Sequence, residues 1–281
     1  MKREHYTEVK LPNGMKIFCL LKNEVKLVYS EVQDYIKNGI ELHEGNTVFD
    51  VGANIGLFTL LTYQLCNKNV KVYAFEPIPE IFEVLQANVQ RFDAEKLMVF
   101  PYGLSQESKS VTFFYYPKVT IGSTMYPPSK EEIDELKQTL MQNLIKNLNI
   151  GWTSWIRWIP PFLRQLIIDN QIEKGFQGKQ VTCQLRTLSE VIREHNVEQI
   201  DLLKVDVEKS ELDVLLGIED RDWQKIKQVV VEVHNLDFKI EKTTSLLKEK
   251  GLSKITVEQN PFFNNNSIVS LYALRQKSEE K

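Results

Sequence analysis

The chain has 281 residues, 42% of them hydrophobic, so it is long enough to bury one substantial core, and no Pro-, Gly- or Ser-rich run divides it. Its 35 Lys and Arg residues against 38 Asp and Glu residues give a formal net charge of −3, which offers no electrostatic basis for binding nucleic acid or an anionic membrane. We therefore expect one elaborated domain whose partner is a small molecule or a protein.

The cysteines Cys19, Cys66 and Cys183 are far apart and show no C-x-x-C spacing. An odd number of isolated cysteines is typical of buried thiols in a reducing compartment, so we expect neither a disulfide nor a structural zinc site. The N-terminal sequence MKREHYTEVK lacks the apolar segment of a signal peptide, and no run of about eighteen uncharged apolar residues occurs. These features predict a cytoplasmic protein.

Residues 1–46 are predicted to form a hairpin and a lid helix ahead of the main domain. The turn signal LPNG at 11–14 separates EVK from the apolar run MKIFCLL, which favours a hairpin. In 27–40, apolar residues recur at helical spacing. Tyr29 and Tyr35 on this helix are expected either to cover a bound ligand or to pack in the core.

From residue 47 to 275, strands and helices alternate. The near-continuous apolar runs suit parallel strands that are covered on both faces, and the last two runs are expected to pair as an antiparallel edge. The predicted strands are TVFDV, VKVYAFE, LMVFPYGL, IDLLKVDV, QVVVEVH, SKITVEQ and SIVSLYALR. They predict an α/β fold with a doubly wound, mostly parallel seven-stranded sheet, and leave 276–281 as a tail.

Helical stretches lie between these strands, and two of them carry start signals. Thr187 with Glu190 and Ser210 with Asp213 have the capping-box spacing, in which two side chains satisfy free amides at a helix N-terminus. The helical stretches are LFTLLTYQL, PEIFEVLQANVQRF, LSEVIREHN, SELDVLLGI and TTSLLKEKG.

Residues 126–180 interrupt the alternation with two consecutive helical patterns, and we expect them to form an insertion over the active-site edge of the sheet. Trp152, Trp155 and Trp158 recur every three residues and so share roughly one helical face. Packing of the insertion onto the sheet is the main role that this spacing favours. The alternative is an aromatic wall for a substrate, with Trp155 as its contact.

The segment TVFDVGANIGLFTL at 47–60 combines an apolar strand, a glycine-containing turn and an amphipathic helix. In open α/β sheets, ligands bind at the carboxyl ends of the strands, beside the point where the strand order reverses. Gly52 and Gly56 let the backbone approach a ligand closely, and the free amides of the following helix can hold a carboxylate or phosphate. A ligand site is favoured here over a purely structural turn.

Glu76, at the end of the next predicted strand, indicates a nucleoside ligand, because a carboxylate there accepts hydrogen bonds from both ribose hydroxyls. Dinucleotide sites normally carry G-x-G-x-x-G, whereas this loop reads GANIG and lacks one glycine. A nicotinamide-dependent dehydrogenase is therefore the weaker interpretation. S-adenosylmethionine has a carboxylate, a sulfonium and an adenosine but no phosphate, so a shorter loop suffices.

Together these motifs resemble those of the FkbM-type methyltransferases. The similarity lies in DVGANIG at 50–56, AFEP at 74–77, LLKVDVEKSELDVLLG at 202–217 and EVH at 232–234, and it covers roughly residues 27–275. It implies a Rossmann-like class I methyltransferase that transfers the methyl group of S-adenosylmethionine to oxygen. The family includes stand-alone tailoring enzymes and domains embedded in polyketide or nonribosomal peptide synthases.

The N-terminal LPNGMKIFCLLKNEV, followed by EVQDYIKNGIELHEGNTVFDVGANIG, is most similar to the synthase-embedded branch, so the chain is expected either to act alone or to belong to a larger synthase. One position departs from the family: Glu208 is followed by Lys209, where the family usually has glycine. Because glycine allows a close backbone approach that lysine does not, the local geometry of this loop is left open.

The resemblance assigns, position by position, the parts of the cofactor site. The expected contacts are Asp50, Gly52, Asn54 and Gly56 for the methionine end, Glu76 for the ribose, and Ile78, Gly103 and Leu104 for the adenine. Asn88 is interpreted as a structural residue of the helix after Glu76.

Methyl transfer is an in-line displacement at carbon, so the protein must align the acceptor oxygen and remove its proton. His234, at the end of a predicted strand, is the predicted base, because the unperturbed pKa of histidine is about 6.5. Glu232 lies on the same side of the pleat, and Asp206 is expected to orient His234 or hold the acceptor hydroxyl. The alternative for His234 is a structural histidine that holds a loop.

A divalent metal held by Asp206, Glu208 and His234 is a second and less favoured interpretation, because nothing in the sequence fixes further ligands. Lys204 interrupts an apolar strand, where an unpaired ammonium is costly, so it is expected to pair with a carboxylate or a carbonyl. The remaining histidines, which are assigned no role, are His5, His43 and His195.

Substrate contacts are predicted at Ser123, Tyr35 and Trp155; for Ser123 and Thr124 the alternative is a local bond to the turn backbone. The sequence thus predicts an O-methyltransferase that converts S-adenosylmethionine to S-adenosylhomocysteine and acts on a polyketide or peptide intermediate, free or tethered to a carrier protein. The alternatives are an N-methyltransferase and a non-catalytic docking domain of a synthase that binds the cofactor.

Overall fold

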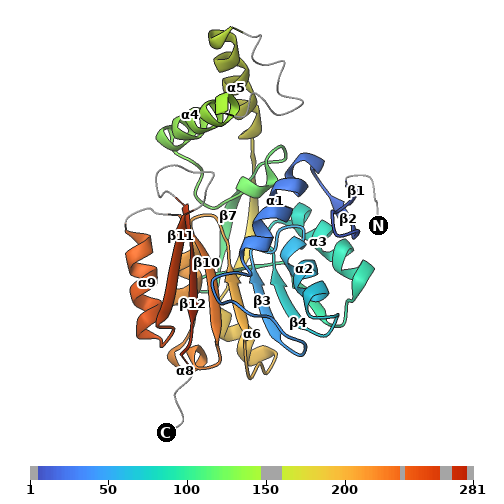
Figure 1. Ribbon diagram of the computed structural model, residues 1–281, viewed down its shortest axis with the longest axis vertical. Helices are drawn as coiled ribbons and strands as arrows, with labels where there is room; N and C mark the ends of the chain where they lie inside the picture. Colours follow the sequence, from blue (N-terminus) through green and yellow to red (C-terminus); the bar gives the residue numbers. More distant parts are fainter. Residues whose placement is uncertain (1–5, 147–159, 235–237, 260–267, 277–281) are drawn as a thin grey trace.

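The computed structural model describes residues 6–146, 160–234, 238–259 and 268–276. A seven-stranded sheet in the order β11-β12-β10-β9-β3-β4-β5 forms its centre (Figure 1). The strands are β3 (Thr47–Val51), β4 (Lys71–Phe75), β5 (Leu97–Phe100), β9 (Leu202–Val205), β10 (Gln228–His234), β11 (Lys254–Gln259) and β12 (Ile268–Leu274). The pairs among β3, β4, β5, β9 and β10 are parallel, and β12 pairs antiparallel with β10 and β11. The predicted mostly parallel sheet with an antiparallel edge is confirmed.

Two hydrophobic clusters cover the two faces of this sheet, because successive strand residues point to opposite sides. Val48 belongs to the cluster that packs against α1, α2 and α3, and its neighbour Phe49 to the one that packs against α6, α7, α8 and α9. These helices are α1 (Lys22–Asp34), α2 (Leu57–Leu65), α3 (Pro79–Phe92), α6 (Leu188–Glu194), α7 (Glu211–Leu216), α8 (Asp220–Trp223) and α9 (Lys239–Glu249).

The N-terminal strands β1 (Thr7–Lys10) and β2 (Lys16–Cys19) form the expected antiparallel hairpin. Asn88 on α3 fastens it to the sheet: its Oδ1 accepts the Phe18 N–H at 2.7 Å, and its Nδ2 donates to the carbonyls of Phe18 at 3.0 Å and Ile55 at 2.8 Å. The helix expected over 27–40 begins and ends earlier, as α1. Tyr35 therefore follows the last turn of the helix.

A second, three-stranded sheet was missed by the sequence analysis. Its order is β6-β8-β7, with β6 (Gly103–Leu104), β7 (Lys109–Tyr115) and β8 (Lys179–Arg186). The run LMVFPYGL, expected as one strand, is split between β5 and β6, because Pro101 has no N–H to continue the ladder.

The helices α4 (Lys130–Lys146) and α5 (Pro161–Gly175) project beyond the carboxyl edge of the main sheet (Figure 1). An ion pair of 3.5 Å between Lys137 Nζ and Asp169 Oδ1 joins them. They occupy the stretch expected as an insertion, and the exact domain boundaries stay predictions. The three tryptophans predicted on one face, Trp152, Trp155 and Trp158, lie outside the described residues. Within the described ranges, every helix is too short or too polar to cross a membrane.

One of the two predicted capping boxes is confirmed and the other is wrong. At Thr187, the Glu190 N–H donates to Thr187 Oγ1 and the Thr187 N–H to Glu190 Oε2, both at 3.2 Å. The Ser210 side chain caps no amide. Glu211 Oε1 instead accepts the N–H of Lys209, which precedes the helix, at 2.7 Å, because its carboxylate reaches back over the turn.

Candidate active site

The turn after β3 is held in a conformation that requires glycine. Gly52 has a φ of +77°, and a Cβ there would lie 1.7 Å from the carbonyl oxygen of Asp206, closer than two atoms can approach. Asn54 is also left-handed, with a φ of +50°, and its Oδ1 accepts the Ile55 N–H at 2.7 Å. Gly56, with a φ of +90°, leads into α2. The turn thus packs directly on the loop that follows β9.

Glu76 lies beside this turn, at the end of β4. Its carboxylate accepts the backbone N–H of Asn54 at 3.2 Å and that of Ile78 at 2.9 Å. Burial raises the pKa of Glu76 to about 7, against the opposing effect of these two amides. The carboxylate of Glu76 therefore tethers the turn after β3 to the start of α3, and each of its oxygens retains a lone pair for a ribose hydroxyl.

The three residues predicted for the adenine come together at the next strand end. Ile78 immediately precedes α3, and Gly103 and Leu104 form β6, which pairs with the end of β8. A Cβ on Gly103 would meet Leu185 at 2.7 Å and Pro77 at 3.4 Å. Ile78 and Leu104 are both buried, Ile78 in the cluster that contains Val48 and Leu104 in the cluster that contains Phe49.

Asp50, Lys204 and Asp206 form a chain of alternating charge across β3 and β9. Lys204 Nζ lies 3.1 Å from Asp50 Oδ1 and 3.6 Å from Asp206 Oδ2, and it donates to the Gly52 carbonyl at 2.8 Å. Burial alone would lower the pKa of Lys204, but the two carboxylates offset it and the pKa is raised. The pairing expected for Lys204 is present.

Asp50 was expected to contact the methionine end of the cofactor, and the structure places it underneath the turn instead. Its side chain is fully buried, and its Oδ2 accepts the Thr59 hydroxyl at 2.6 Å. The hydroxyl of Tyr35 donates to Asp206 Oδ2 at 3.0 Å, and burial and this carboxylate raise the pKa of Tyr35 well above its ordinary value. The Tyr35 hydroxyl, from the N-terminal segment, is thus the last group in this series of charged and polar side chains.

A second charged chain lies at the end of β10. His234 Nδ1 is 2.8 Å from Glu211 Oε1, and His234 Nε2 is 3.3 Å from Glu208 Oε2. Burial would lower the pKa of His234, but these two carboxylates hold it well above 6.5. The expectation that Asp206 orients His234 is therefore corrected: Glu211, at the start of α7, reaches the ring, whereas the Asp206 carboxylate is engaged by Tyr35 and Lys204.

The loop at Glu208 and Lys209 is strained. Both residues are left-handed, with φ values of +49° and +78°, which cost a non-glycine residue about 1–2 kcal/mol each. Four contacts hold this conformation, and three come from other elements. They are Thr124 Oγ1 to the Glu208 carbonyl at 2.9 Å, the Lys209 N–H to Glu211 Oε1 at 2.7 Å, Lys239 Nζ to the Lys209 carbonyl at 2.5 Å, and Lys209 Nζ to Glu132 Oε1 at 2.7 Å.

Two acidic residues near these chains have strongly shifted pKa values. Burial, with the carboxylates of Asp206 and Glu208, raises the pKa of Glu31 on α1 to about 7. Burial and the Asp206 carboxylate raise the pKa of Glu232 well above its ordinary value. The sequence analysis overlooked Glu31, although the helical spacing from Glu31 to Tyr35 places both on one face of the N-terminal segment.

The chemistry of this region fits S-adenosylmethionine in two ways. The sulfonium is a cation. Besides burial, the carboxylates of Asp206 and Glu208 raise the pKa of Glu31, so a positive ligand nearby would offset their repulsion. In addition, Glu24 Oε1 is buried without a hydrogen-bond partner among the described residues, and Glu24 lines a small cavity with Asn54 and Ile55. An α-ammonium group beside the turn would satisfy that atom.

The other predicted substrate contacts have local roles. Ser123 Oγ accepts the Tyr116 N–H at 3.1 Å, and Thr124 Oγ1 accepts the Tyr126 N–H at 3.1 Å while donating to the Glu208 carbonyl. Both hydroxyls thus bond the turn backbone, which was the stated alternative. Trp155 lies outside the described residues.

The alternative metal site is not assembled in the described residues. No three acidic, histidine or cysteine side chains there are arranged to hold an ion. Of the three ligands considered, Glu208 and His234 form an ion pair with each other, and Asp206 contacts Lys204 and Tyr35.

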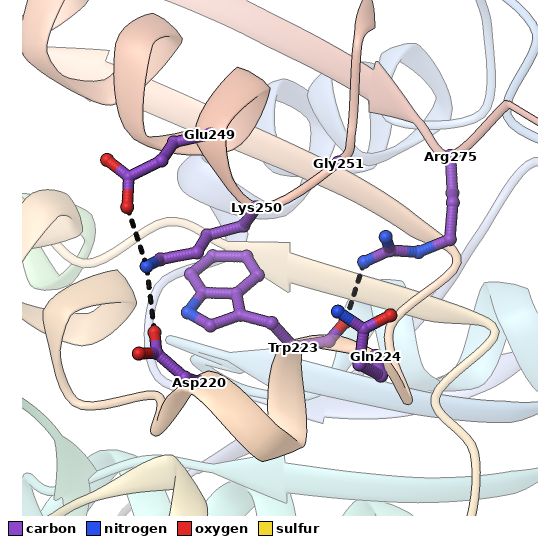
Figure 2. Close-up of a pocket in the computed structure, with 7 residues that line it drawn as sticks. All are labelled: Asp220, Trp223, Gln224, Glu249, Lys250, Gly251 and Arg275. Atoms are coloured by element: carbon purple, nitrogen blue, oxygen red, sulfur yellow. Dashed lines mark hydrogen bonds and ion pairs between the residues drawn. The ribbon is translucent and has the colours of Figure 1, made fainter.

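A cavity of about 290 Å³ lies at the opposite edge of the sheet, near the start of β10 (Figure 2). Its charged side chains already have partners. Lys250 Nζ donates to Asp220 and Glu249 at 2.8 Å each, and Arg275 Nη2 donates to the Trp223 carbonyl at 2.7 Å. None of the residues that line this cavity belongs to the candidate site, and its charged groups are already paired with one another or with the backbone.

Comparison with known proteins identifies the family. Residues 50–253 match the methyltransferase FkbM domain. The chain is 36% identical over 270 residues to the 31-O-demethyl-FK506 methyltransferase FkbM of Streptomyces tacrolimicus, covering 95% of this chain and 96% of that one. It is 32% identical over 283 residues to the AMB antimetabolite synthetase AmbE of Pseudomonas aeruginosa, covering 97% of this chain but only 13% of the synthetase.

A solved structure, methyltransferase FkbM from Methylobacillus flagellatus, shares the fold with a TM-score of 0.52 at 14% identity, covering 84% of this chain and 45% of that one. The family match spans most of the chain, and the relative from Streptomyces tacrolimicus is covered nearly end to end. The chain accordingly belongs to the FkbM family of S-adenosylmethionine-dependent methyltransferases.

Proposed function

We propose that this methyltransferase acts on a hydroxyl group of a natural-product intermediate. The observation that carries the proposal is the His234 ring held between Glu208 and Glu211 at the carboxyl edge of the sheet. An alcohol needs help in losing its proton, and a positioned base contributes about a hundredfold to ten-thousandfold to such a transfer. Groups that accept and hold protons are gathered where we expect the transferred methyl group to lie.

The cofactor-binding part is proposed at the adjacent strand ends. When bound, S-adenosylmethionine supplies an electrophilic methyl group on sulfur. The turn from Gly52 to Gly56 would hold its methionine end, Glu76 its ribose, and Ile78 with Gly103 and Leu104 its adenine. Lys204 fixes the position of Asp206 through their ion pair and so keeps the acceptor side of the site in register with the turn.

The class of acceptor is inferred from the relatives. The Streptomyces tacrolimicus protein is named for 31-O-demethyl-FK506, and the Pseudomonas aeruginosa protein is an antimetabolite synthetase. We extend these names to an acceptor hydroxyl on a polyketide or peptide intermediate that is tethered to a carrier protein. The similarity of the N-terminal segment to synthase-embedded domains supports the tether.

Mass spectrometry tests this proposal directly. The protein is incubated with methyl-labelled S-adenosylmethionine and with 31-O-demethyl-FK506, carrier-bound hydroxyacyl thioesters or the matched aminoacyl thioesters, each with and without EDTA. Label on a hydroxyl, unchanged by EDTA, supports the proposal. Label on the amines alone would replace it with N-methylation, and loss of label in EDTA would establish the metal alternative. Calorimetric binding of the cofactor without any transfer would favour the docking domain.

A further inference from the structure

The chain formed by Glu211, His234 and Glu208 leads from the interior of the protein to its surface. The exposed fraction of the side chain rises from 0% for Glu211 through 11% for His234 to 33% for Glu208. A ligand approaching the carboxyl edge of β10 therefore meets Glu208 before it can reach the imidazole. The outermost group of the chain is a carboxylate.

Both nitrogens of His234 already face a carboxylate, Nδ1 at 2.8 Å from Glu211 and Nε2 at 3.3 Å from Glu208. An imidazole that donates from both nitrogens is a cation and has no lone pair to accept a further proton. Glu208, in contrast, has one ion-pair contact from its side chain within the described residues, so part of its acceptor capacity is unused.

The backbone aims the Glu208 side chain at this edge. Glu208 and Lys209 are both left-handed, and Glu211 Oε1 accepts the Lys209 N–H and faces His234 Nδ1 with the same atom. Thr124 fixes the Glu208 carbonyl from the loop before the insertion. Strain that several elements together maintain is typical of residues held for a function.

We propose that Glu208 is the catalytic base that receives the proton of the acceptor hydroxyl, and that His234 and Glu211 are positioning residues that hold its carboxylate. The assignment rests on the proposed O-methylation. Asp206 is the competing carboxylate, but its Oδ2 is engaged by both the Tyr35 hydroxyl and Lys204, a permanent cation. These two donors leave Asp206 less free acceptor capacity for the substrate proton than Glu208 has.

The step balances within the site. The acceptor oxygen forms a bond to the methyl carbon with its lone pair, and the carbon–sulfur bond breaks with its electrons going to sulfur. The hydroxyl proton goes to the Glu208 carboxylate, which becomes a neutral acid and later releases the proton to solvent. The positive charge on sulfur and the negative charge on Glu208 disappear together, so no net charge is left buried.

Charged groups from every neighbouring element affect this carboxylate. On the acidic side they are Glu31 of α1, Glu132 of α4, Asp206 after β9, Glu211 of α7 and Glu232 of β10; on the basic side they are Lys204, Lys209, Lys239 and His234. Replacing His234 removes the cation in direct contact with Glu208. Because His234 then no longer holds the Glu208 carboxylate in place, kcat should fall while the KM for the acceptor changes little.

The first test does not depend on an acceptor. Calorimetry at pH 8 compares S-adenosylmethionine, a cation at sulfur, with S-adenosylhomocysteine, which is neutral there, for wild type, Glu208→Gln and the exposed control Glu219→Gln. Glu208→Gln is expected to weaken S-adenosylmethionine about threefold to tenfold while S-adenosylhomocysteine stays within twofold. An unchanged ratio of the two affinities would mean that Glu208 does not face the methyl group and would overturn the proposal.

The second test measures turnover on the hydroxyl acceptor that wild type methylates. Glu208→Gln should lower kcat at least a hundredfold, and Glu208→Asp should restore part of it. His234→Gln should keep measurable turnover, with a lower kcat and a nearly unchanged KM for the acceptor. A large loss in Asp206→Asn combined with near wild-type turnover in Glu208→Gln would transfer the role to Asp206. If wild type binds both cofactor forms but methylates no hydroxyl, the proposed function fails, and the binding test still decides where Glu208 points.

Discussion

Lys209 Nζ lies 2.7 Å from Glu132 Oε1, and this ion pair joins the loop after β9 to the first helix of the insertion. Lys209 occupies a left-handed position where the family usually has glycine. The cost of a Cβ in that conformation is therefore accompanied by a contact that glycine cannot make. The insertion and the acidic edge of the site are mechanically connected at this point.

Substitutions at this ion pair are expected to differ in their effect on stability but to share one effect on acceptor binding. Lys209→Gly relieves the left-handed strain, so it should unfold with a free energy about 1 kcal/mol above that of Lys209→Ala, which loses the ion pair but keeps the strain. Both variants, and Glu132→Gln, should raise the KM for the acceptor with an unchanged affinity for S-adenosylmethionine. Urea unfolding and steady-state kinetics measure the two effects, and an acceptor KM unaltered in all three variants would contradict the connection.

Glu31 predicts a pH dependence that distinguishes the two forms of the cofactor. Because its pKa is raised to about 7, Glu31 is neutral below that pH and ionised above it. A cationic ligand binds the ionised form better, so the affinity for S-adenosylmethionine should rise about threefold to tenfold from pH 6 to pH 8, relative to S-adenosylhomocysteine. Glu31→Gln should flatten this dependence, whereas Asp34→Asn, on the same helix but exposed and paired with Lys37, should not.

Glu24 predicts the complementary behaviour. Its buried Oε1 faces the small cavity beside Asn54, where the amino acid end of the cofactor is proposed to lie. Both cofactor forms carry the same α-ammonium group, so Glu24→Gln should weaken both by a similar factor of about tenfold. Calorimetry of the two ligands checks this, with the exposed neighbour Lys22→Ala as a control. A loss confined to S-adenosylmethionine would place Glu24 near the sulfur instead.

The two predicted helix caps give a matched test of stability. Thr187→Ala removes the confirmed capping box of α6 and should cost about 1 kcal/mol of unfolding free energy. Ser210→Ala removes a hydroxyl that caps no amide and has no hydrogen-bond partner among the described residues, so it should change stability by less than about 0.5 kcal/mol. Equal losses in the two variants, measured by chemical denaturation, would contradict the assignment.

The main sheet was predictable because its central strands β3, β4, β9 and β10 are buried on both faces and are recognisable as apolar runs. The second sheet was not, since β7 and β8 are each half exposed and lie on either side of the insertion. The alternation at the end of β8, where Cys183 and Leu185 are buried and Gln184 is exposed, was the available signal.

Some features of the candidate site were also predictable from local sequence, and others were not. The turn at Gly52 and the carboxylate of Glu76 follow from local patterns, because a strand end and its turn are continuous in the sequence. The partners of His234 do not, since Glu208 and Glu211 belong to the preceding strand–helix unit and reach the ring only through the parallel pairing of β9 with β10. The sequence suggested Asp206 and Glu232 as partners of His234 and Glu208 only as a metal ligand, whereas the tertiary contacts bring Glu208 and Glu211 to the ring.

The missing side chain at position 52 has a consequence beyond the turn itself. The Asp206 carbonyl packs against the α-carbon of Gly52. The turn after β3, which would hold the methyl donor, and the loop after β9, which would meet the acceptor, therefore cannot shift independently. Changes in α4 and α5 that keep the ion pair between Lys209 and Glu132 would leave that alignment in place, so the acceptor could change while the transfer distance stays constant.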